Sequence, residues 1–228
     1  MRKRINDRFR VLLLLSALVL GGLSHAQDVE HSAPEWNALG VEHYSAGDWV
    51  NALQCFLQAA ALVPDNQTVL RNLSNAYQAY AGQLAEAGDY STAAQQLEES
   101  IKVDSDNPMP RIQLGSYFLR MGLVQDAIAR LEEAILLAPE NLDAHELLGD
   151  AYYQDNDLSA ALAQWEFVAE VNPGRAGLQE KLEKGYREDA VEYNFRGLRS
   201  RHFEIGHAPE TDHGLIRQTL TVLEHAYR

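Results

Sequence analysis

One spacing pattern recurs down this chain of 228 residues and limits what it can fold into. The first copy runs from Trp36 to Pro64 and sets large apolar and small residues at fixed intervals. Leucine recurs at one point of the pattern, alanine at a second and a large apolar residue at a third: Leu39, Leu73, Leu114 and Leu148; Ala52, Ala93, Ala127 and Ala161; Phe56, Leu97, Leu131 and Trp165. Two of the steps are 34 residues long, from Leu114 to Leu148 and from Pro139 to Pro173. A period of that length marks a unit that buries its apolar face only by stacking on its neighbours, which argues against an ordinary enzyme core.

This pattern resembles the tetratricopeptide repeat family over four units, at residues 33–66, 67–107, 108–141 and 142–175. The resemblance implies an all-α fold, in which helix-turn-helix units stack into a right-handed superhelical α-solenoid. Small residues let the first helix of each unit approach the second: Gly40, Ser74, Gly115 and Gly149. Proline follows the second helix in three units, where it removes a backbone donor and ends the helix, and Ser105 replaces it in the second unit.

The second unit is longer than the others. The step from Leu73 to Leu114 is 41 residues, seven more than the period, and the excess falls between Ser74 and Ala93. Seven residues drift only about 20 degrees around a straight helix, so two added turns keep the same face inward. We therefore expect a longer first helix. Because Gly82 weakens a helix, a loop from Gly82 to Gly88 is the competing interpretation.

The first 26 residues have the three parts of a secretory signal peptide. Five basic residues precede an apolar stretch at 11–23, and Ser24-His25-Ala26 supplies small residues at the positions that a signal peptidase inspects. We expect cleavage after Ala26 and a periplasmic or secreted protein, with no stable membrane insertion after cleavage. An uncleaved membrane anchor is the alternative, although the apolar stretch is short for a spanning helix.

Without the signal peptide, the chain carries 14 Lys and Arg against 32 Asp and Glu, a net formal charge of −18. Nucleic acid is an unfavourable partner, because binding to phosphates requires clustered Lys and Arg. Anionic membrane surfaces are unfavourable for the same reason. The simplest explanation of the charge is the solubility of an exported, elongated protein, and a basic partner is the sharper alternative.

Cys55 is the only cysteine, so no disulfide can form within the chain. It lies on the expected second helix of the first unit, immediately before Phe56. We interpret it as a packing residue; an exposed thiol used in dimerisation or redox chemistry is the alternative, although no cation lies nearby in the sequence to lower its pKa.

In stacked helical pairs, the first helices line a concave surface that such arrays use for ligands. Residues one turn apart on these helices that packing does not use should point into it. The candidate partner-binding residues are Asn37, Val41, Tyr44, Arg71, Asn75, Gln78, Ile112, Ser116, Leu119, Glu146, Asp150 and Tyr153. This mixture of groups suits an extended peptide or a partner helix, and the carboxylates of the last unit could meet Lys or Arg. Some members of the family clamp a peptide's terminal carboxylate with lysines and asparagines, but Val41 and the absence of lysine on these faces argue against that activity; a solvated groove without ligand is the other interpretation.

After Pro173 the repeat pattern ends. Leu178, Leu182 and Tyr186 predict a terminal capping helix at 177–187, with Glu180, Lys181, Glu183 and Lys184 facing water and a linker up to residue 198. The alternation at 200–205 predicts one unpaired strand. A turn from Ala208 to Asp212 and an amphipathic helix should follow, with Leu215, Ile216, Thr219, Leu220, Leu223 and Tyr227 on its apolar face. We expect residues 199–228 to be the incomplete α/β start of a further domain.

The stretch His202-Phe203-x-Ile205, followed by Leu223-Glu224-x-Ala226-Tyr227, resembles the start of gluzincin-type (peptidase MA-like) metallopeptidase domains found after tetratricopeptide arrays in some exported bacterial proteins. That resemblance implies a zinc site further along. Such peptidases need His-Glu-x-x-His on a helix, and the nearest match, at His145-Glu146, has Gly149 in place of the second histidine. The histidines at 202, 207 and 213 have no zinc-site spacing, so we expect no metal and no cofactor.

No phosphate loop, nucleophile elbow or paired catalytic carboxylates stand out, so we expect no enzymatic activity in this chain. The carboxylate pairs Glu98-Glu99 and Glu132-Glu133 are most simply solvated outer faces of second helices. Two functional classes remain. The first is an exported scaffold that binds a protein or peptide through its concave face, and the second is the recognition arm of a larger periplasmic zinc metallopeptidase-like protein.

Overall fold

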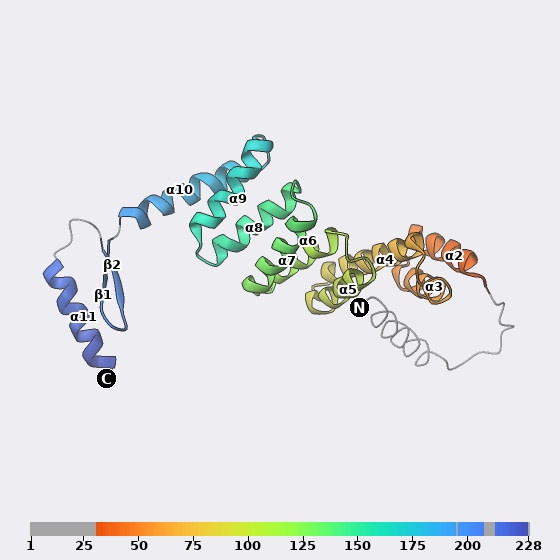
Figure 1. The fold of residues 1–228 in the computed structure, drawn as a ribbon, viewed down its shortest axis with the longest axis horizontal. Helices are drawn as coiled ribbons and strands as arrows, with labels where there is room; N and C mark the ends of the chain where they lie inside the picture. Colours follow the sequence, from red (N-terminus) through yellow and green to blue (C-terminus); the bar gives the residue numbers. More distant parts are fainter. Residues whose placement is uncertain (1–30, 195, 208–212, 228) are drawn as a thin grey trace. The chain divides into compact units, whose positions relative to one another are not determined.

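A computed structural model describes residues 31–194, 196–207 and 213–227. The predicted signal peptide and the predicted turn from Ala208 to Asp212 lie outside the described residues. The chain divides after Asn141 into two compact units, which we call the N-terminal body and the C-terminal body. Helices dominate both bodies (Figure 1).

The N-terminal body contains three helix pairs and the C-terminal body one pair, followed by further elements. The pairs are α2 (Ala33–Ser45) with α3 (Trp49–Leu62), α4 (Gln67–Glu86) with α5 (Tyr90–Val103), α6 (Met109–Arg120) with α7 (Val124–Leu137), and α8 (Leu142–Gln154) with α9 (Leu158–Val171). Then come α10 (Leu178–Asn194), β1 (Arg196–Arg199), β2 (Glu204–His207) and α11 (His213–Tyr227). Each predicted repeat therefore corresponds to one helix pair, as the all-α repeat prediction requires.

Small residues bring the two helices of a pair together in three of the four pairs. A Cβ atom added at Gly40 would lie 2.6 Å from the ring of Phe56, and one added at Gly115 would lie 2.5 Å from Leu131 Cγ. The same addition at Gly149 would lie 2.4 Å from Trp165 Nε1. Real side chains do not approach so closely, so the predicted close approach of the first helix to the second is confirmed at these three glycines.

The lengthened repeat has a longer first helix and no loop at its end. Helix α4 has 20 residues, against 13 in α2, and it continues through Gly82 to Glu86. The helical interpretation of the seven added residues is therefore confirmed. The helix can accommodate the added residues because seven residues make almost two full turns, so the same face of α4 stays buried along its whole length.

Ser74 was expected to let α4 approach α5, and this prediction is confirmed. Its Oγ meets Ser100 Oγ of α5 at 2.8 Å, and both residues are fully buried. The lengthened helix also has a second small residue at its other end. Ala81 is fully buried in the same cluster as Leu97, and it lies five residues before the end of α4, as Gly40 does in α2.

Helix α4 consequently contributes to two cores. Its first half, with Leu73 and Ala76, packs into a cluster with Phe56 and other residues of α3. Its second half, with Ala81, packs into a cluster with Leu97 of α5 and with α6. One long helix thus joins the first repeat to the third without a break.

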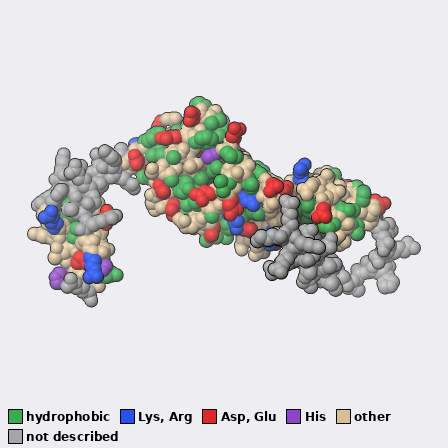
Figure 2. Space-filling view, in the orientation of Figure 1, with side chains coloured by type: hydrophobic (Ala, Val, Ile, Leu, Met, Phe, Trp, Pro, Cys, Tyr) green, Lys and Arg blue, Asp and Glu red, His purple; other side chains and the backbone are tan. Residues whose placement is uncertain are grey.

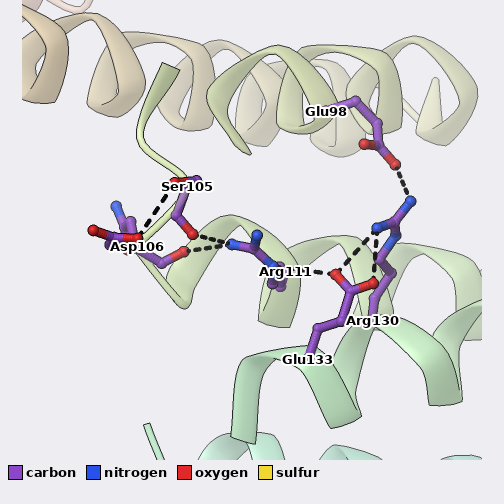
Figure 3. Close-up of polar contacts among 7 residues, drawn as sticks. Glu98, Ser105, Asp106, Arg111, Arg130 and Glu133 are labelled. Carbon is purple, nitrogen blue, oxygen red and sulfur yellow. Dashed lines mark hydrogen bonds and ion pairs between the residues drawn. The ribbon is translucent and has the colours of Figure 1, made fainter. Parts of the chain in front are cut away.

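An ionic network joins the second and third repeats where the expected proline is missing. Arg111 Nη1 donates to the carbonyl oxygens of Ser105 and Asn107 at 3.0 and 3.2 Å, and Arg111 Nε pairs with Glu133 Oε2 at 3.2 Å (Figure 3). Arg130 bridges Glu133 to Glu98 of α5, at 3.1 and 2.9 Å. Arg111 therefore supplies donors to the carbonyls of the α5–α6 turn. Glu98 and Glu133, predicted to be solvated, are half-buried partners of arginine.

In the C-terminal body, α10 begins close to the predicted residue and is longer than predicted. Leu178 and Leu182 are buried, as expected, but Tyr186 is 47% exposed and donates its hydroxyl to Glu166 Oε1 at 2.7 Å. A Cβ atom at Gly185 would lie 2.8 Å from Leu162 Cδ2, which shows how closely α10 approaches α9. Lys181, predicted to face water, lies against α8 instead.

The prediction of one unpaired strand is wrong. Strand β2 pairs antiparallel with β1, from Arg196 opposite His207 to Arg199 opposite Glu204, and β1 lies in the segment predicted to be linker. The predicted helix is confirmed as α11. Ile216 and Leu220 are buried, but Leu215, also expected on the apolar face, is 59% exposed.

A carboxylate fastens the β1–β2 connection to α11. Glu224 accepts hydrogen bonds from Ser200 Oγ and the His202 backbone N–H, both at 2.6 Å, and lies 2.8 Å from His202 Nδ1. The His202 ring stacks on Tyr227 at 4.4 Å between centroids. The hydrogen bonds from Ser200 and His202 lower the pKa of Glu224 to about 2.

Candidate functional site

The predicted partner-binding residues of the N-terminal body lie on α2, α4 and α6, and we call this set the inner face. Three of them are exposed: Val41, Arg71 and Asn75. Asn37, Tyr44, Gln78, Ser116 and Leu119 are half-buried. Ile112 is only 5% exposed and is part of the core, so its expected role at a binding surface is wrong. The prediction used spacing alone, which does not show that this aliphatic position is covered.

Several inner-face side chains are held in place by neighbours within the N-terminal body. Asn72 Nδ2 donates to Asn37 Oδ1 at 2.9 Å, which links α4 to α2. Gln78 Nε2 donates to the Ser74 carbonyl at 3.2 Å. The Tyr44 ring meets the Trp49 ring edge to face, with centroids 5.0 Å apart. Asn75 is exposed one turn after Arg71, so it can offer both its amide donors and its carbonyl oxygen to a ligand.

The charge of the inner face differs from that of the whole body. Residues 31–141 contain 14 acidic and five basic side chains, yet no residue of the inner face is acidic. Arg71 is its one charged member, and within the described residues it makes no ion pair, whereas Lys102, Arg111 and Arg130 do. On the face that Figure 2 shows, the side chains coloured as acidic are more frequent over the repeats than those coloured as basic. The net negative charge therefore lies outside the inner face.

The corresponding carboxylates of the C-terminal body already have partners. Lys181 Nζ of α10 lies 2.7 Å from Glu146 Oε1 and 2.7 Å from Asp150 Oδ1. Arg175 also pairs with Glu146, and with Asp143 at 2.5 Å. Asp150 accepts a further hydrogen bond from Trp165 Nε1 at 3.2 Å. The lysine and arginine that these acids contact belong to the same chain, and contact with a basic group of a partner stays a prediction.

Tyr153, the third predicted residue of α8, is engaged in the same way. Its hydroxyl donates to Glu188 Oε2 at 2.6 Å, and Lys184 Nζ lies 4.7 Å from the centroid of its ring. All three predicted residues of α8 therefore contact α10 or the turn before it. The predicted binding face of this repeat is covered by the chain's own helix.

These contacts perturb the pKa values of the groups involved. Burial alone raises the pKa of Glu146, but hydrogen bonds and charge attraction from Lys181 and Arg175 outweigh it, and the pKa is lowered. For Lys181, burial lowers the pKa, while the bonds to Asp150 and Glu146 outweigh that effect and raise it. Both shifts favour the charged forms, so the ion pairs are stable at neutral pH.

The contacts of Arg175, Lys181 and Glu188 with the binding residues of α8 were not predicted, although the sequence contains a signal for them. Leu182 lies 34 residues after Leu148, so α10 continues the repeat period as if it were the first helix of a fifth unit. Its neighbour Lys181 then faces the preceding first helix. The prediction stopped at Pro173 because no second helix follows with the small and large residues of the pattern.

Two residues that the sequence offered as candidates for redox or metal chemistry, Cys55 and His145, are packed against neighbouring side chains. Cys55 is buried, and desolvation raises the pKa of its thiol, with a contribution from Asp48. His145, in the incomplete zinc motif, lies with Nδ1 2.7 Å from Gln164 Oε1 and packs on Phe167. Among the described residues, no three His, Cys, Asp or Glu side chains gather in a way that could hold a metal ion. None of the helices in the described ranges has the length and hydrophobicity to span a membrane.

Comparison with known sequences finds the same repeat in two segments. Models of the tetratricopeptide repeat match residues 33–66 and 112–171. The lengthened repeat at 67–107 lies between these matches. Human tetratricopeptide repeat protein 13 is 31% identical over 64 residues, which is 28% of this chain. The chain spans only 7% of that protein's length.

Solved structures with this fold include proteins of distant sequence. MamA from Desulfovibrio magneticus RS-1 has a TM-score of 0.53 at 22% identity, covering 69% of this chain and 85% of that one. The first tetratricopeptide domain of Spaghetti (RPAP3), solved with the HSP90 peptide SRMEEVD, has a TM-score of 0.51 at 20% identity, covering 51% and 93%. The Arabidopsis OM64 domain has a TM-score of 0.51 at 16% identity, covering 52% and 98%. Residues 33–66 and 112–171 therefore carry tetratricopeptide repeats, and the solved structures show that the paired helices described above have the fold of such repeats.

Proposed function

We propose that this chain is an exported scaffold whose inner face, on α2, α4 and α6, binds an extended peptide segment of a partner protein. The observation that carries the proposal is the difference between the two bodies. The equivalent residues of α8 are bonded to α10, whereas Val41, Arg71 and Asn75 are exposed, and Arg71 has no ion pair within the described residues. Among the repeat helices, the inner face of the N-terminal body is the part left open to a ligand.

The chemistry of the inner face suits an extended peptide. Asn75 can both donate to and accept from a peptide backbone, and Val41 offers apolar surface with 45% of its area exposed. The related fold of Spaghetti (RPAP3) was solved with the HSP90 peptide SRMEEVD, which supports peptide binding by repeats of this type. That peptide is rich in carboxylates, while this inner face offers one arginine and no lysine. We therefore propose a ligand with at most one acidic group near Arg71.

A basic ligand has less support than the net charge suggested. Glu146 and Asp150, the acidic residues that prompted it, are paired with Lys181 and Arg175. The inner face of the N-terminal body contains no acidic side chain. A basic partner stays a prediction for the outer faces and turns, where the acids lie.

The test uses the full mature chain and a library of random phage-displayed peptides. Selected peptides are measured by isothermal titration against the wild type, Asn75→Ala and Arg71→Gln. Gln95→Ala is the matched control, because Gln95 is also an exposed helical amide but lies on the second helix α5. We expect Asn75→Ala to weaken binding about fivefold to tenfold, as for the loss of a hydrogen bond, and Gln95→Ala to leave it unchanged. If the selected peptides bind Asn75→Ala and Arg71→Gln with the same affinity as the wild type, the inner face is not the binding site.

Export is the second element of the proposal. It rests on the basic, apolar and small-residue segments of residues 1–26. The test is expression of the complete chain in a bacterial host, followed by fractionation and N-terminal sequencing. We expect a periplasmic protein that begins at Gln27, and an Ala26→Lys variant that keeps its leader. An uncleaved protein in the cytoplasm contradicts the proposal.

A second candidate function is the recognition arm of a larger metallopeptidase-like protein. The observation that favours it is the exposed apolar surface of α11. Leu215 and Val222 of α11 are 59% and 67% exposed, and a two-stranded sheet is rarely stable alone. The test is the genomic reading frame around this sequence. A His-Glu-x-x-His helix in a following domain supports this candidate, and a stop codon after Arg228 contradicts it.

A further inference from the structure

The turns inside the helix pairs share one design. A residue with positive φ precedes the N-cap of the second helix in each pair: Gly47, Gly88, Gly122 and Asn156. In three of the pairs an aspartate at the N-cap then accepts the backbone N–H three residues ahead, at 3.4, 3.0 and 3.0 Å: Asp48, Asp89 and Asp157. Such a cap satisfies a helix donor that otherwise has no partner in the helix.

The third repeat departs from this design. Leu123 is the N-cap of α7 and provides no side-chain hydrogen bond. Its backbone angles, φ −88 and ψ 66, nearly equal those of Asp89, φ −85 and ψ 68. The local geometry would therefore accept an aspartate. Leucine at this position gives up a cap, and its side chain is still 40% exposed.

Leu123 lies in the turn between α6 and α7, where Arg120 and Met121 are also exposed. We call these three residues, together with the half-buried Tyr90 and Tyr117 beside Arg120, the turn patch. Met121 is 39% exposed. Arg120 donates to the Tyr90 hydroxyl at 3.4 Å, its Cζ lies 5.8 Å from the centre of that ring, and the Tyr90 and Tyr117 rings are 5.7 Å apart. No carboxylate pairs with Arg120 among the described residues, although acids outnumber bases in this body.

We propose that the turn patch is a second docking surface, distinct from the inner face, for an acidic amphipathic segment of a partner protein. Tyr, Arg and Met are the residue types enriched where binding energy concentrates. The occupant places an aliphatic side chain against Met121 and Leu123 and a carboxylate against Arg120. We choose an acidic segment by charge complementarity, because Arg120 is a cation that has no carboxylate partner among the described residues. On this proposal, position 123 carries leucine rather than a capping aspartate because leucine makes an apolar contact with the partner.

The experiment exploits a substitution that removes the patch without harming the fold. Leu123→Asp restores the cap found in the other three pairs, so we expect its denaturation midpoint to rise, with a folding equilibrium constant on the order of fivefold larger. Random phage-displayed peptides are selected in parallel on the full-length wild type and on Leu123→Asp. We expect peptides that combine Leu, Ile or Phe with Asp or Glu to be enriched on the wild type alone. Their affinity should fall about tenfold or more in Leu123→Asp and in Arg120→Gln.

Asn75→Ala on the inner face is the control, and it should leave the affinity of these peptides unchanged. Equal enrichment on the wild type and Leu123→Asp overturns the proposal. It is also overturned if Lys-rich peptides are selected in place of acidic ones. A lower denaturation midpoint for Leu123→Asp shows that Leu123 serves the fold, which removes the reason to assign it to a partner.

Discussion

Gly82 gives a direct test of how α4 is built. It lies inside a 20-residue helix with ordinary helical backbone, and a Cβ atom added there would have no neighbour within 4 Å. Glycine costs a helix about 1 kcal/mol relative to alanine, mainly because the unfolded chain has more conformations to lose. We therefore expect Gly82→Ala to stabilise the N-terminal body by about 1 kcal/mol.

Alanine at two other glycines should have the opposite effect on stability, for two different physical reasons. Gly88 also has open space around its Cβ position, but its φ is +84, so alanine there should destabilise by roughly 1–2 kcal/mol through backbone strain alone. Gly115 has ordinary backbone, but its added Cβ would lie 2.5 Å from Leu131 Cγ. Overpacking at Gly115 should cost about 1–3 kcal/mol. The three variants therefore measure helix propensity, backbone strain and side-chain overpacking separately within the N-terminal body.

The assay is urea denaturation followed by circular dichroism, together with hydrogen exchange of the α4 amides. Exchange is needed because repeats unfold in part, so a single global transition does not describe each helix. Gly82→Ala should slow exchange in α4 about fivefold. A loss of stability in Gly82→Ala would refute the reasoning, because it would mean that this face of α4 is packed or that the helix is interrupted at this residue.

Three further results are expected. Ser100→Ala removes the buried hydroxyl that bonds Ser74, and it should lower the denaturation free energy by about 1–3 kcal/mol; an unchanged midpoint would show that this pair contributes nothing. Lys181→Met keeps the packing of α10 but leaves Glu146 without one of its cations. Hydrogen exchange of the α10 amides should therefore become faster, by an amount equivalent to about 1 kcal/mol, and the increase should be smaller in high salt. An increase that does not depend on salt would contradict the ionic explanation. The pKa of Glu224 in the folded protein is about 2, below its ordinary 4.5. The hydrogen bonds of Glu224 should therefore hold the β1–β2 connection against α11 fully above pH 4.5, and this stabilisation is lost as the pH falls toward 2. NMR titration should show the loss in the wild type and not in Glu224→Gln.

The sequence was sufficient for the helix pairs because their packing depends on residue size at fixed spacing. Gly40 and Gly115 each allow a close approach of the two helices of their pair, as predicted. The extension of α4 was also predictable, since seven residues complete almost two turns. The contribution of Ala81 was not predicted, because the alignment assigned the small-residue position of this repeat to Ser74 alone. In the lengthened helix, Ala81 is a second small residue, and it lies in the same core cluster as Leu97.

The candidate site was predicted less well than the fold. Spacing identifies which residues share a face, but it does not say what covers that face. Ile112 was assigned to the surface and is buried, while Glu146 was assigned to a partner and is paired within the chain. Strand β1 was missed because its four residues, Arg-Gly-Leu-Arg, have too little apolar alternation to indicate a strand. These errors concern contacts between distant segments, for which a local pattern holds no information.

The packing of α4 into two cores bears on how such a protein can change in length over time. A deletion of one residue between Ser74 and Ala81 would turn the following half of the helix by about 100 degrees and expose the residues that now face Leu97. Loss or gain of seven residues almost preserves the direction in which each half faces, and it changes the distance between the two cores by about 10 Å along the helix. We therefore expect insertions and deletions inside one repeat to be tolerated best in steps of seven residues, so that the array gains length without gaining another repeat.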